Sequence, residues 1–254
     1  MKDNILKQKG SSIALLPNLL TTISLFSGFY SIVASLEGDF FRAAVAILVA
    51  AVFDGLDGRV ARITNTTSHF GMEYDSLSDL VSFGVAPGLL VYLWAIQSYG
   101  RYGWLAAFLY VATTALRLAR FNSRIEKTPK NMFIGLPCPA AAMVIATSLL
   151  FYNFIGFSGD MANLLILLLV YLLSYLMVSN HFYNSFKVIP QARSFYILVG
   201  MVLALIVIAS EPPVTLFLLA LGYMLSAPLA GIYRFVTKKS RKQQNNEQQE
   251  YDYR

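Results

Sequence analysis

The chain has 254 residues, of which 56% are hydrophobic, 14% aromatic and only 13% charged, with a mean hydropathy of +0.56. Soluble domains carry about 25% charged residues, so this composition excludes an ordinary water-soluble protein. The net charge of +6 comes from basic residues scattered over loops rather than gathered on one face, which argues against nucleic-acid binding. The single cysteine, Cys138, excludes an internal disulfide.

Continuous apolar runs of about 17 to 25 residues predict transmembrane helices, because the strands of a membrane barrel would alternate in polarity. We therefore predict an all-α integral membrane protein with about eight transmembrane helices. Their expected ranges are 13–36, 40–61, 75–97, 103–121, 134–155, 161–180, 194–210 and 213–235. This gives an N-terminal segment over 1–12, a transmembrane domain over 13–236 and a polar tail over 237–254, which we expect to be disordered.

The basic residues predict the orientation of these spans. Of the 20 lysines and arginines, only Arg42 and Arg101 fall on one side of the eight-span arrangement, and all the others fall on the opposite side. Cytoplasmic loops carry an excess of basic residues, so we expect both termini to face the cytoplasm.

Four aspartates interrupt this apolar sequence in two helix-spaced pairs, Asp54 with Asp57 and Asp75 with Asp79. Residues three or four apart share a face of a helix, so antiparallel packing of the second and third spans would bring all four carboxylates together at the cytoplasmic side. A carboxylate near the bilayer is costly and usually marks a functional site. Such a group needs cations to remain ionised, and oxygen ligands favour hard ions, so we predict one or two Mg²⁺ or Mn²⁺ ions.

Small and basic residues surround the aspartates. Hard divalent cations at a membrane surface suit a phosphoryl or pyrophosphate group. Gly58 has no side chain to block a ligand from the backbone, and Ala61 keeps the next turn low. Arg62 has the fork geometry that grips a phosphate, and Gly71 would relieve crowding where the helices meet.

At these positions the chain resembles the CDP-alcohol phosphatidyltransferase family. The family pattern D-x-x-D-G-x-x-A-R, eight residues, G-x-x-x-D-x-x-x-D is matched in full over residues 54–79. The segments PNLLTTISLFSGF, DSLSDLVSFGVAP, LRLARFN and FIGLPCPAAA are similar to bacterial phosphatidylserine synthases within that family. The likeness covers residues 13 to 180, and it implies the family's membrane fold with a cytoplasm-facing active site in the transmembrane domain.

The resemblance implies a transfer of the phosphatidyl group from CDP-diacylglycerol to the hydroxyl of L-serine, which gives phosphatidylserine and CMP. Family roles carried over to this chain make Asp54, Asp57 and Asp75 metal ligands, while Asp79 borders the metal site and acts as the general base. The resemblance also implies a homodimer and, for a bacterial protein, the cytoplasmic membrane.

The same resemblance implies that the other residues of the family pattern surround the nucleotide. Gly58, Ala61, Arg62 and Gly71 would line the site for CDP-diacylglycerol. The aspartate pattern itself does not decide the acceptor, so glycerol 3-phosphate, inositol phosphate and choline remain alternatives to serine. An ion-coupled transporter is an alternative of another class, although it would be expected to place its acids near mid-membrane.

A cluster of arginines at the end of the fourth span provides candidates for acceptor binding. The segment LRLARFNSR contains Arg117, Arg120 and Asn122, and a guanidinium matches a carboxylate or a phosphate. We expect Arg120 and Asn122, with Arg117 as a further candidate, to contact serine or the reacting phosphate. The competing interpretation is that these basic residues only anchor a cytoplasmic loop to anionic lipid.

Overall fold

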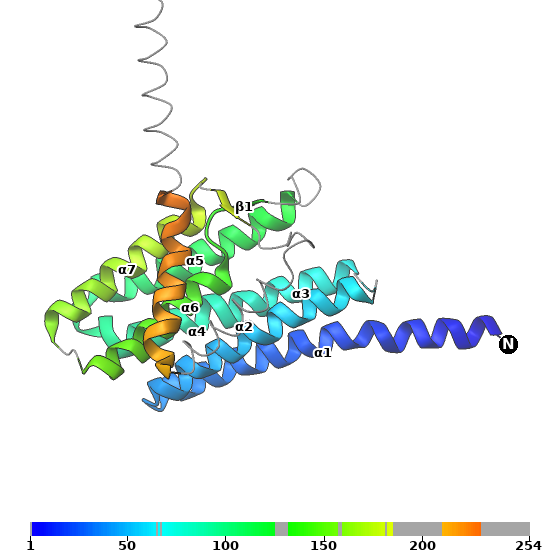
Figure 1. Cartoon of the computed structure of the whole chain (residues 1–254), viewed down its shortest axis with the longest axis horizontal. Coiled ribbons are helices and arrows are strands. Elements are labelled where there is room, and N and C mark those ends of the chain that lie inside the picture. Colours follow the sequence, from blue (N-terminus) through cyan, green and yellow to red (C-terminus); the bar gives the residue numbers. More distant parts are fainter. Residues whose placement is uncertain are drawn as a thin grey trace, which may run out of the picture.

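The computed structural model describes residues 2–64, 66, 68–124, 132–156, 159–180, 182–184 and 210–229, and helices dominate them (Figure 1). The α-helices are α1 (Lys2–Leu36), α2 (Phe40–Ile63), α3 (His69–Asp79), α4 (Ala86–Val91), α5 (Arg101–Arg124), α6 (Cys138–Ile155) and α7 (Asp160–Val178). Between α3 and α5 lie the π-helical turns η1 (Leu80–Val85) and η2 (Tyr92–Ile96) and the 3₁₀ turn η3 (Gln97–Tyr99). A further helix covers Pro212–Leu229.

Five of the described helical segments are long and apolar enough to cross a membrane. They are Leu15–Leu36, His69–Tyr99, Cys138–Ile155, Asp160–Val178 and Pro212–Leu229. Two more helices, α2 and α5, have 24 residues each and are long enough, but their charged residues lower their hydropathy. The structure thus confirms the helical class, whereas residues 194–209 of the predicted span 194–210 lie outside the described residues.

The first and third spans differ from expectation in their extent. Helix α1 begins at Lys2, so most of the segment predicted over 1–12 is a continuation of the first helix. The helical backbone of the third span is continuous from His69 to Tyr99, although Pro87 has no N–H to donate to the carbonyl of Phe83. The buried hydroxyl of Tyr110 on α5 donates to that carbonyl at 3.0 Å, so the free acceptor is satisfied and α5 is fixed to the third span.

Helix α1 supports both aspartate-bearing segments. It packs along α2 and also against α3, η1 and α4, while α2 packs on α1 and α6 and reaches the third span at η1 and α4. A Cβ atom built on Gly28 of α1 would lie 2.6 Å from the Cα atom of Ser82, so the two backbones approach closely there. The second and third spans are in contact, as expected, and the first span packs against both of them.

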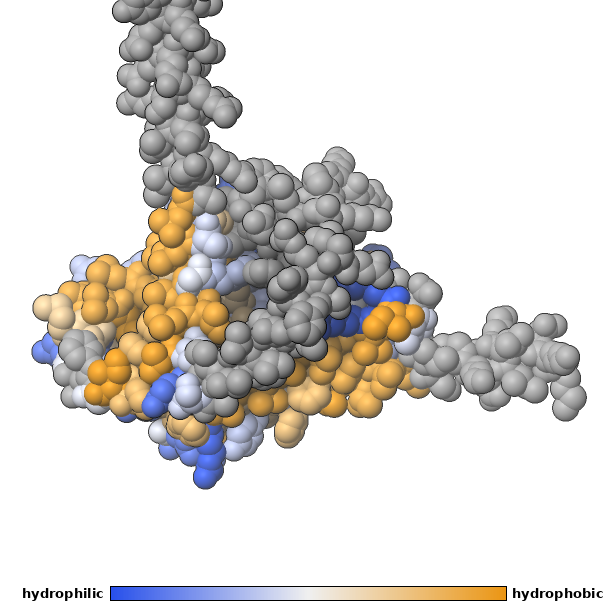
Figure 2. Space-filling view, viewed as in Figure 1, coloured by the Kyte–Doolittle hydropathy of each residue, from blue (hydrophilic) through white to orange (hydrophobic). Residues whose placement is uncertain are grey.

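Helix α6 lies between two apolar clusters. One face packs with α5, α7 and residues 212–229, and the other packs with α1, α2 and η1. The helix begins at Cys138, later than the predicted start at 134, because residues 132–134 form strand β1 (Met132–Ile134), antiparallel to β2 (Phe182–Asn184). Gly135 follows with a φ of +78°, which favours glycine. Figure 2 shows apolar residues over most of this face, with hydrophilic residues gathered where α2 ends and α3 begins.

Candidate functional site

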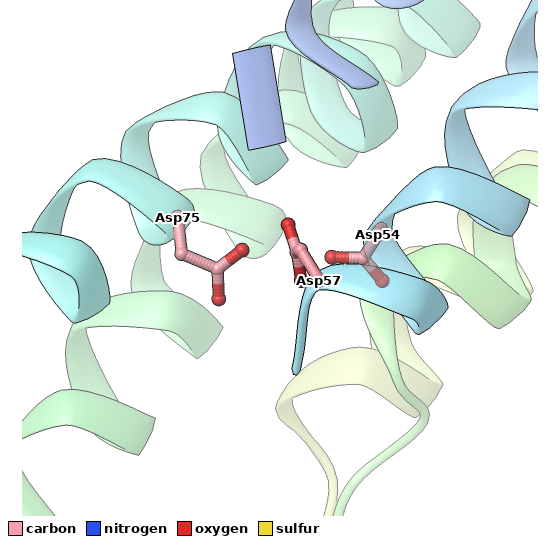
Figure 3. A group of neighbouring side chains, drawn as sticks. All are labelled: Asp54, Asp57 and Asp75. Atoms are coloured by element: carbon pink, nitrogen blue, oxygen red, sulfur yellow. The ribbon is translucent and has the colours of Figure 1, made fainter. Parts of the chain in front are cut away.

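The last turns of α2 and the first turns of α3 bring three carboxylates together. Asp54, Asp57 and Asp75 each offer an oxygen, and these oxygens all lie within 4.8 Å of one another. Figure 3 shows the carboxyl groups of Asp54 and Asp75 approaching Asp57 from two different helices. The helix-spaced aspartate pairs of the sequence therefore meet in space, through folding of the intervening loop.

The fourth aspartate adjoins this group. Asp79 is the last residue of α3, one turn beyond Asp75, and its carboxyl group interacts electrostatically with those of Asp54 and Asp75. Like charges this close favour a proton or a bound cation that offsets their repulsion. The fourth aspartate therefore lies beside the group of three carboxylates.

The oxygen atoms of the group fit a hard divalent cation. Asp75 Oδ1 is buried, and it has no hydrogen-bond partner among the described residues, where Ser31 Oγ is the other buried side-chain atom of this kind. Buried polar atoms are rarely left without a partner, so an unpaired carboxylate oxygen beside two other carboxylates indicates a missing ligand. Carboxylate oxygens favour Mg²⁺, Mn²⁺ or Ca²⁺ over softer ions. Asp54, Asp57 and Asp75 are therefore able to hold a metal ion.

The predicted nucleotide-binding residues lie on the same helix ends. A Cβ atom on Gly58 would meet nothing within 4 Å, so the space beside the aspartates is open there. Ala61 is half-buried and Arg62 is exposed in the last turn of α2. A Cβ atom added to Gly71 would lie 3.1 Å from Ser68 Oγ, at the N-cap of α3, and 3.3 Å from Asn18 Oδ1 on α1. The tight space beside Gly71 therefore adjoins the cap of its own helix and the first helix.

The arginine cluster at the end of α5 divides into residues with different neighbours. Arg120 donates from Nη1 to the carbonyl of Val178 at 3.0 Å and from Nη2 to Asn180 Oδ1 at 2.6 Å, so it fastens α5 to the end of α7. Asn122 Nδ2 donates to Ser76 Oγ at 3.0 Å, and Ser76 is the neighbour of Asp75 in α3. Asn122 therefore lies against α3, beside the turn that carries Asp75.

Arg117 is half-buried on α5. Its guanidinium interacts with the thiol of Cys138, the first residue of α6, and the carboxyl group of Asp79 interacts electrostatically with the same thiol. Arg117 also interacts with Tyr223, so the helix Pro212–Leu229 reaches this region.

Sequence reasoning missed the contribution of α1. The hydroxyl of Thr21 donates to Asp57 Oδ2 at 2.6 Å, and Ser78 Oγ donates to the backbone carbonyl of Thr21 at 3.2 Å. A pattern in the sequence was available, because small polar residues recur at helical spacing along this apolar helix. They are Thr21, Ser24, Ser27, Ser31 and Ser35, and all are buried.

Comparisons with known proteins agree with this geometry. Residues 14–178 match the family model described as CDP-alcohol phosphatidyltransferase. The chain is 40% identical over 204 residues to the CDP-diacylglycerol–serine O-phosphatidyltransferase of Helicobacter pylori, which covers 80% of this chain and 86% of that protein. It is 39% identical over 176 residues to the archaetidylserine synthase of Methanothermobacter thermautotrophicus, with 68% and 71% covered. A CDP-diacylglycerol–serine O-phosphatidyltransferase of Mycobacterium leprae is 39% identical over 143 residues, with 54% and 47% covered.

Proposed function

Because the chain belongs to the CDP-alcohol phosphatidyltransferase family, we propose that it makes phosphatidylserine and CMP from CDP-diacylglycerol and L-serine. The observation that carries this proposal is the convergence of the family's aspartates around an unpaired, buried oxygen of Asp75. The names of the relatives described above support serine as the acceptor, since each names serine or a serine lipid.

The proposed cofactor is Mg²⁺ or Mn²⁺, as one ion or two, held by Asp54, Asp57 and Asp75 with Asp79 at the border. Bound divalent cations supply charge neutralisation for a pyrophosphate and for a departing phosphate. The open space beside Gly58 leaves room for the nucleotide, and Gly71 lies at the same helix ends. Arg62 supplies a fork of donors for a phosphate.

Asp79 is proposed as the general base. The serine oxygen attacks the phosphorus that carries the diacylglycerol, and the bond between that phosphorus and the bridging oxygen of CMP breaks. The proton of the serine hydroxyl passes to the carboxylate of Asp79. A positioned base and a direct attack make a covalent intermediate on the protein unnecessary.

Arg117 and Asn122 are proposed as contacts for serine or for the reacting phosphate. Arg117 and Asp79 both interact with the thiol of Cys138, and Asn122 is bonded to Ser76, the neighbour of Asp75. Arg120 remains a third candidate, with two of its five N–H donors directed to α7. A guanidinium is well matched to the carboxylate of serine.

The proposal includes the setting of the reaction. The protein is an integral membrane protein, and we propose a cytoplasmic active site because the excess of basic residues falls on the aspartate side. The acyl chains would stay in the bilayer while serine arrives from the cytoplasm. The eight-span topology, the homodimer and the bacterial cytoplasmic membrane belong to this proposal as well.

An acceptor screen tests the function directly. Purified protein with CDP-diacylglycerol and Mn²⁺ would be supplied separately with serine, glycerol 3-phosphate, inositol phosphate and choline, and lipid product and CMP would be measured. We expect cation-dependent release of CMP with serine alone. Product with another acceptor would reassign the substrate, and absence of CMP with every acceptor would contradict a transferase and leave a transporter in its place.

A further inference from the structure

Asp57 is the least exposed residue of the described metal-ligand candidates. Its residue is only 5% exposed, and Asp54 and Asp75 are both half-buried. Asp57 Oδ2 accepts the hydrogen bond from Thr21 Oγ1, and Thr21 is itself only 4% exposed. This bond is therefore shielded from water, where a charge-assisted contact is strongest.

The hydroxyl of Thr21 has one proton and two acceptors within reach. Oγ1 lies 3.1 Å from the carbonyl of Pro17 and 2.6 Å from Asp57 Oδ2. A hydroxyl bonded to a carboxylate typically shows the shorter distance and makes the stronger bond. The hydroxyl proton of Thr21 is therefore donated mainly to Asp57, and the hydrogen bond to the carbonyl of Pro17 is weak.

The backbone of Thr21 is bonded to the other aspartate-bearing segment. Its carbonyl accepts a hydrogen bond at 3.2 Å from Ser78 Oγ, and Ser78 lies between Asp75 and Asp79 in α3. Thr21 thus connects α2 through its side chain and α3 through its main chain. Because α1 packs against both segments, the two hydrogen bonds of Thr21 help to fix the position of one aspartate pair relative to the other.

A second set of bonds one turn away shows what is particular to Thr21. Ser24 Oγ donates to the carbonyl of Ala50 in α2 at 3.0 Å, and Ser82 Oγ donates to the carbonyl of Ser24 at 3.1 Å. Ser24 therefore links the same helices in the same way, but its acceptor on α2 is a backbone carbonyl. Thr21 differs because its side chain donates its hydrogen bond to a carboxylate of the site.

We propose that Thr21 is a positioning residue for the metal centre, an inference that rests on the metal-dependent function proposed above. It holds Oδ2 of Asp57 by a hydrogen bond and so fixes the orientation of the carboxylate that, with Asp54 and Asp75, would hold the cation. Residues that orient metal ligands in this way affect metal affinity or activity by about 10- to 100-fold when they are replaced.

The test measures Mn²⁺ affinity without substrate. Free Mn²⁺ would be titrated by electron paramagnetic resonance against the purified full-length protein and its variants Thr21→Val, Thr21→Ser and Ser24→Ala. We expect Thr21→Val to raise the Kd for Mn²⁺ by about 10- to 100-fold. Thr21→Ser keeps the hydroxyl and should bind Mn²⁺ nearly as well as the native protein. Ser24→Ala removes an equivalent helix contact and should leave the Kd unchanged.

The outcomes separate this inference from the proposed function. Native affinity in Thr21→Val, or an equal loss of affinity in Ser24→Ala, would overturn the positioning role while the metal centre stands. If the native protein itself bound no Mn²⁺, the proposed metal-dependent function would fail first. Should Thr21→Val not fold, Thr21→Ala would be judged by the same comparison of Kd with Thr21→Ser.

Discussion

The aspartate-bearing ends of α2 and α3 and the arginine-bearing end of α5 are both rich in charge, yet their side chains are used differently. Asp54, Asp57 and Asp75 approach one another, and one buried oxygen of Asp75 has no partner among the described residues. Arg120, in contrast, donates two hydrogen bonds to the end of α7. Carboxylates that lie close together and have an oxygen without a hydrogen-bond partner indicate a ligand site. An arginine that is hydrogen-bonded to a neighbouring helix also stabilises the fold.

The largest effect should come from removing a metal ligand on the aspartate side. We expect Asp57→Asn to lower turnover by about a thousandfold, because a catalytic metal supplies several kcal/mol and each 1.36 kcal/mol is tenfold in rate. CMP release from CDP-diacylglycerol and serine measures the loss. Asp39→Asn is the matched control, since Asp39 caps the opposite end of α2 and asparagine also caps helices well. Equal activity in both variants would contradict the metal site.

The next largest effect should distinguish Asp79, the proposed general base, from the proposed metal ligands. We expect Asp79→Asn to lower turnover by about a hundredfold or more, because general-base catalysis contributes that much. Its affinity for Mn²⁺, followed by electron paramagnetic resonance, should fall less than that of Asp75→Asn. The assignment of Asp79 as base would be wrong if Asp79→Asn kept its turnover and lost only metal affinity.

On the arginine side, Arg117 should matter most for catalysis. Loss of a hydrogen bond from a charged donor costs about 1.5–3 kcal/mol, so we expect Arg117→Gln to lower kcat/KM for serine by about 10- to 100-fold. Arg101→Gln, at the opposite end of α5 and exposed, is the control. Steady-state rates at varied serine concentration measure both variants, and an unchanged value in Arg117→Gln would remove this residue from the acceptor site.

The close contact of α1 behind the aspartates predicts a loss of stability. A Cβ on Gly28 would lie 2.4 Å from Ser82 Oγ, so Gly28→Ala should destabilise the fold by about 1–3 kcal/mol through overpacking. Thermal unfolding of the purified protein measures this change. Gly222→Ala adds the same atom where nothing lies within 4 Å, so it should not destabilise the fold and should gain about 0.5–1 kcal/mol from the better helix propensity of alanine. Equal midpoints for the two variants would show that the helices are not held this closely.

Arg120 should give the smallest effect, which sharpens the contrast with Arg117. Its two bonds to α7 predict a loss of about 1–2 kcal/mol in stability for Arg120→Gln. We expect the KM for serine to change little in this variant. A rise in that KM of about tenfold, the size expected for a lost charged hydrogen bond, would instead place Arg120 at the acceptor, as the sequence suggested.

Much of the site follows from local spacing in the sequence. Asp54 with Asp57 and Asp75 with Asp79 had to share helix faces, and the complete family pattern indicated the chemistry before any coordinates. The family prediction is confirmed by the match over residues 14–178. The helical class is confirmed as well, because long apolar runs have few alternatives in a bilayer.

Contacts between segments that are distant in the sequence could not be predicted from local spacing. The bond from Thr21 to Asp57 joins residues 36 positions apart, and a lone threonine in an apolar helix bonds most simply to its own backbone. The strand Met132–Ile134 replaced a predicted helix start, because three residues are too few to show a strand pattern. The interaction of the Cys138 thiol with Arg117 depends on how α5 meets α6, which local spacing does not reveal.

The hydroxyl of Tyr110 has a mechanical consequence for the two charged regions. Since it binds the carbonyl of Phe83, four residues before Pro87, the third span is joined to α5 at 3.0 Å beside its proline. A bend at the proline would have to displace α5 too, and with it Arg117 and Asn122. The proposed base on one helix and the proposed acceptor contacts on the other are thereby coupled across the middle of the protein.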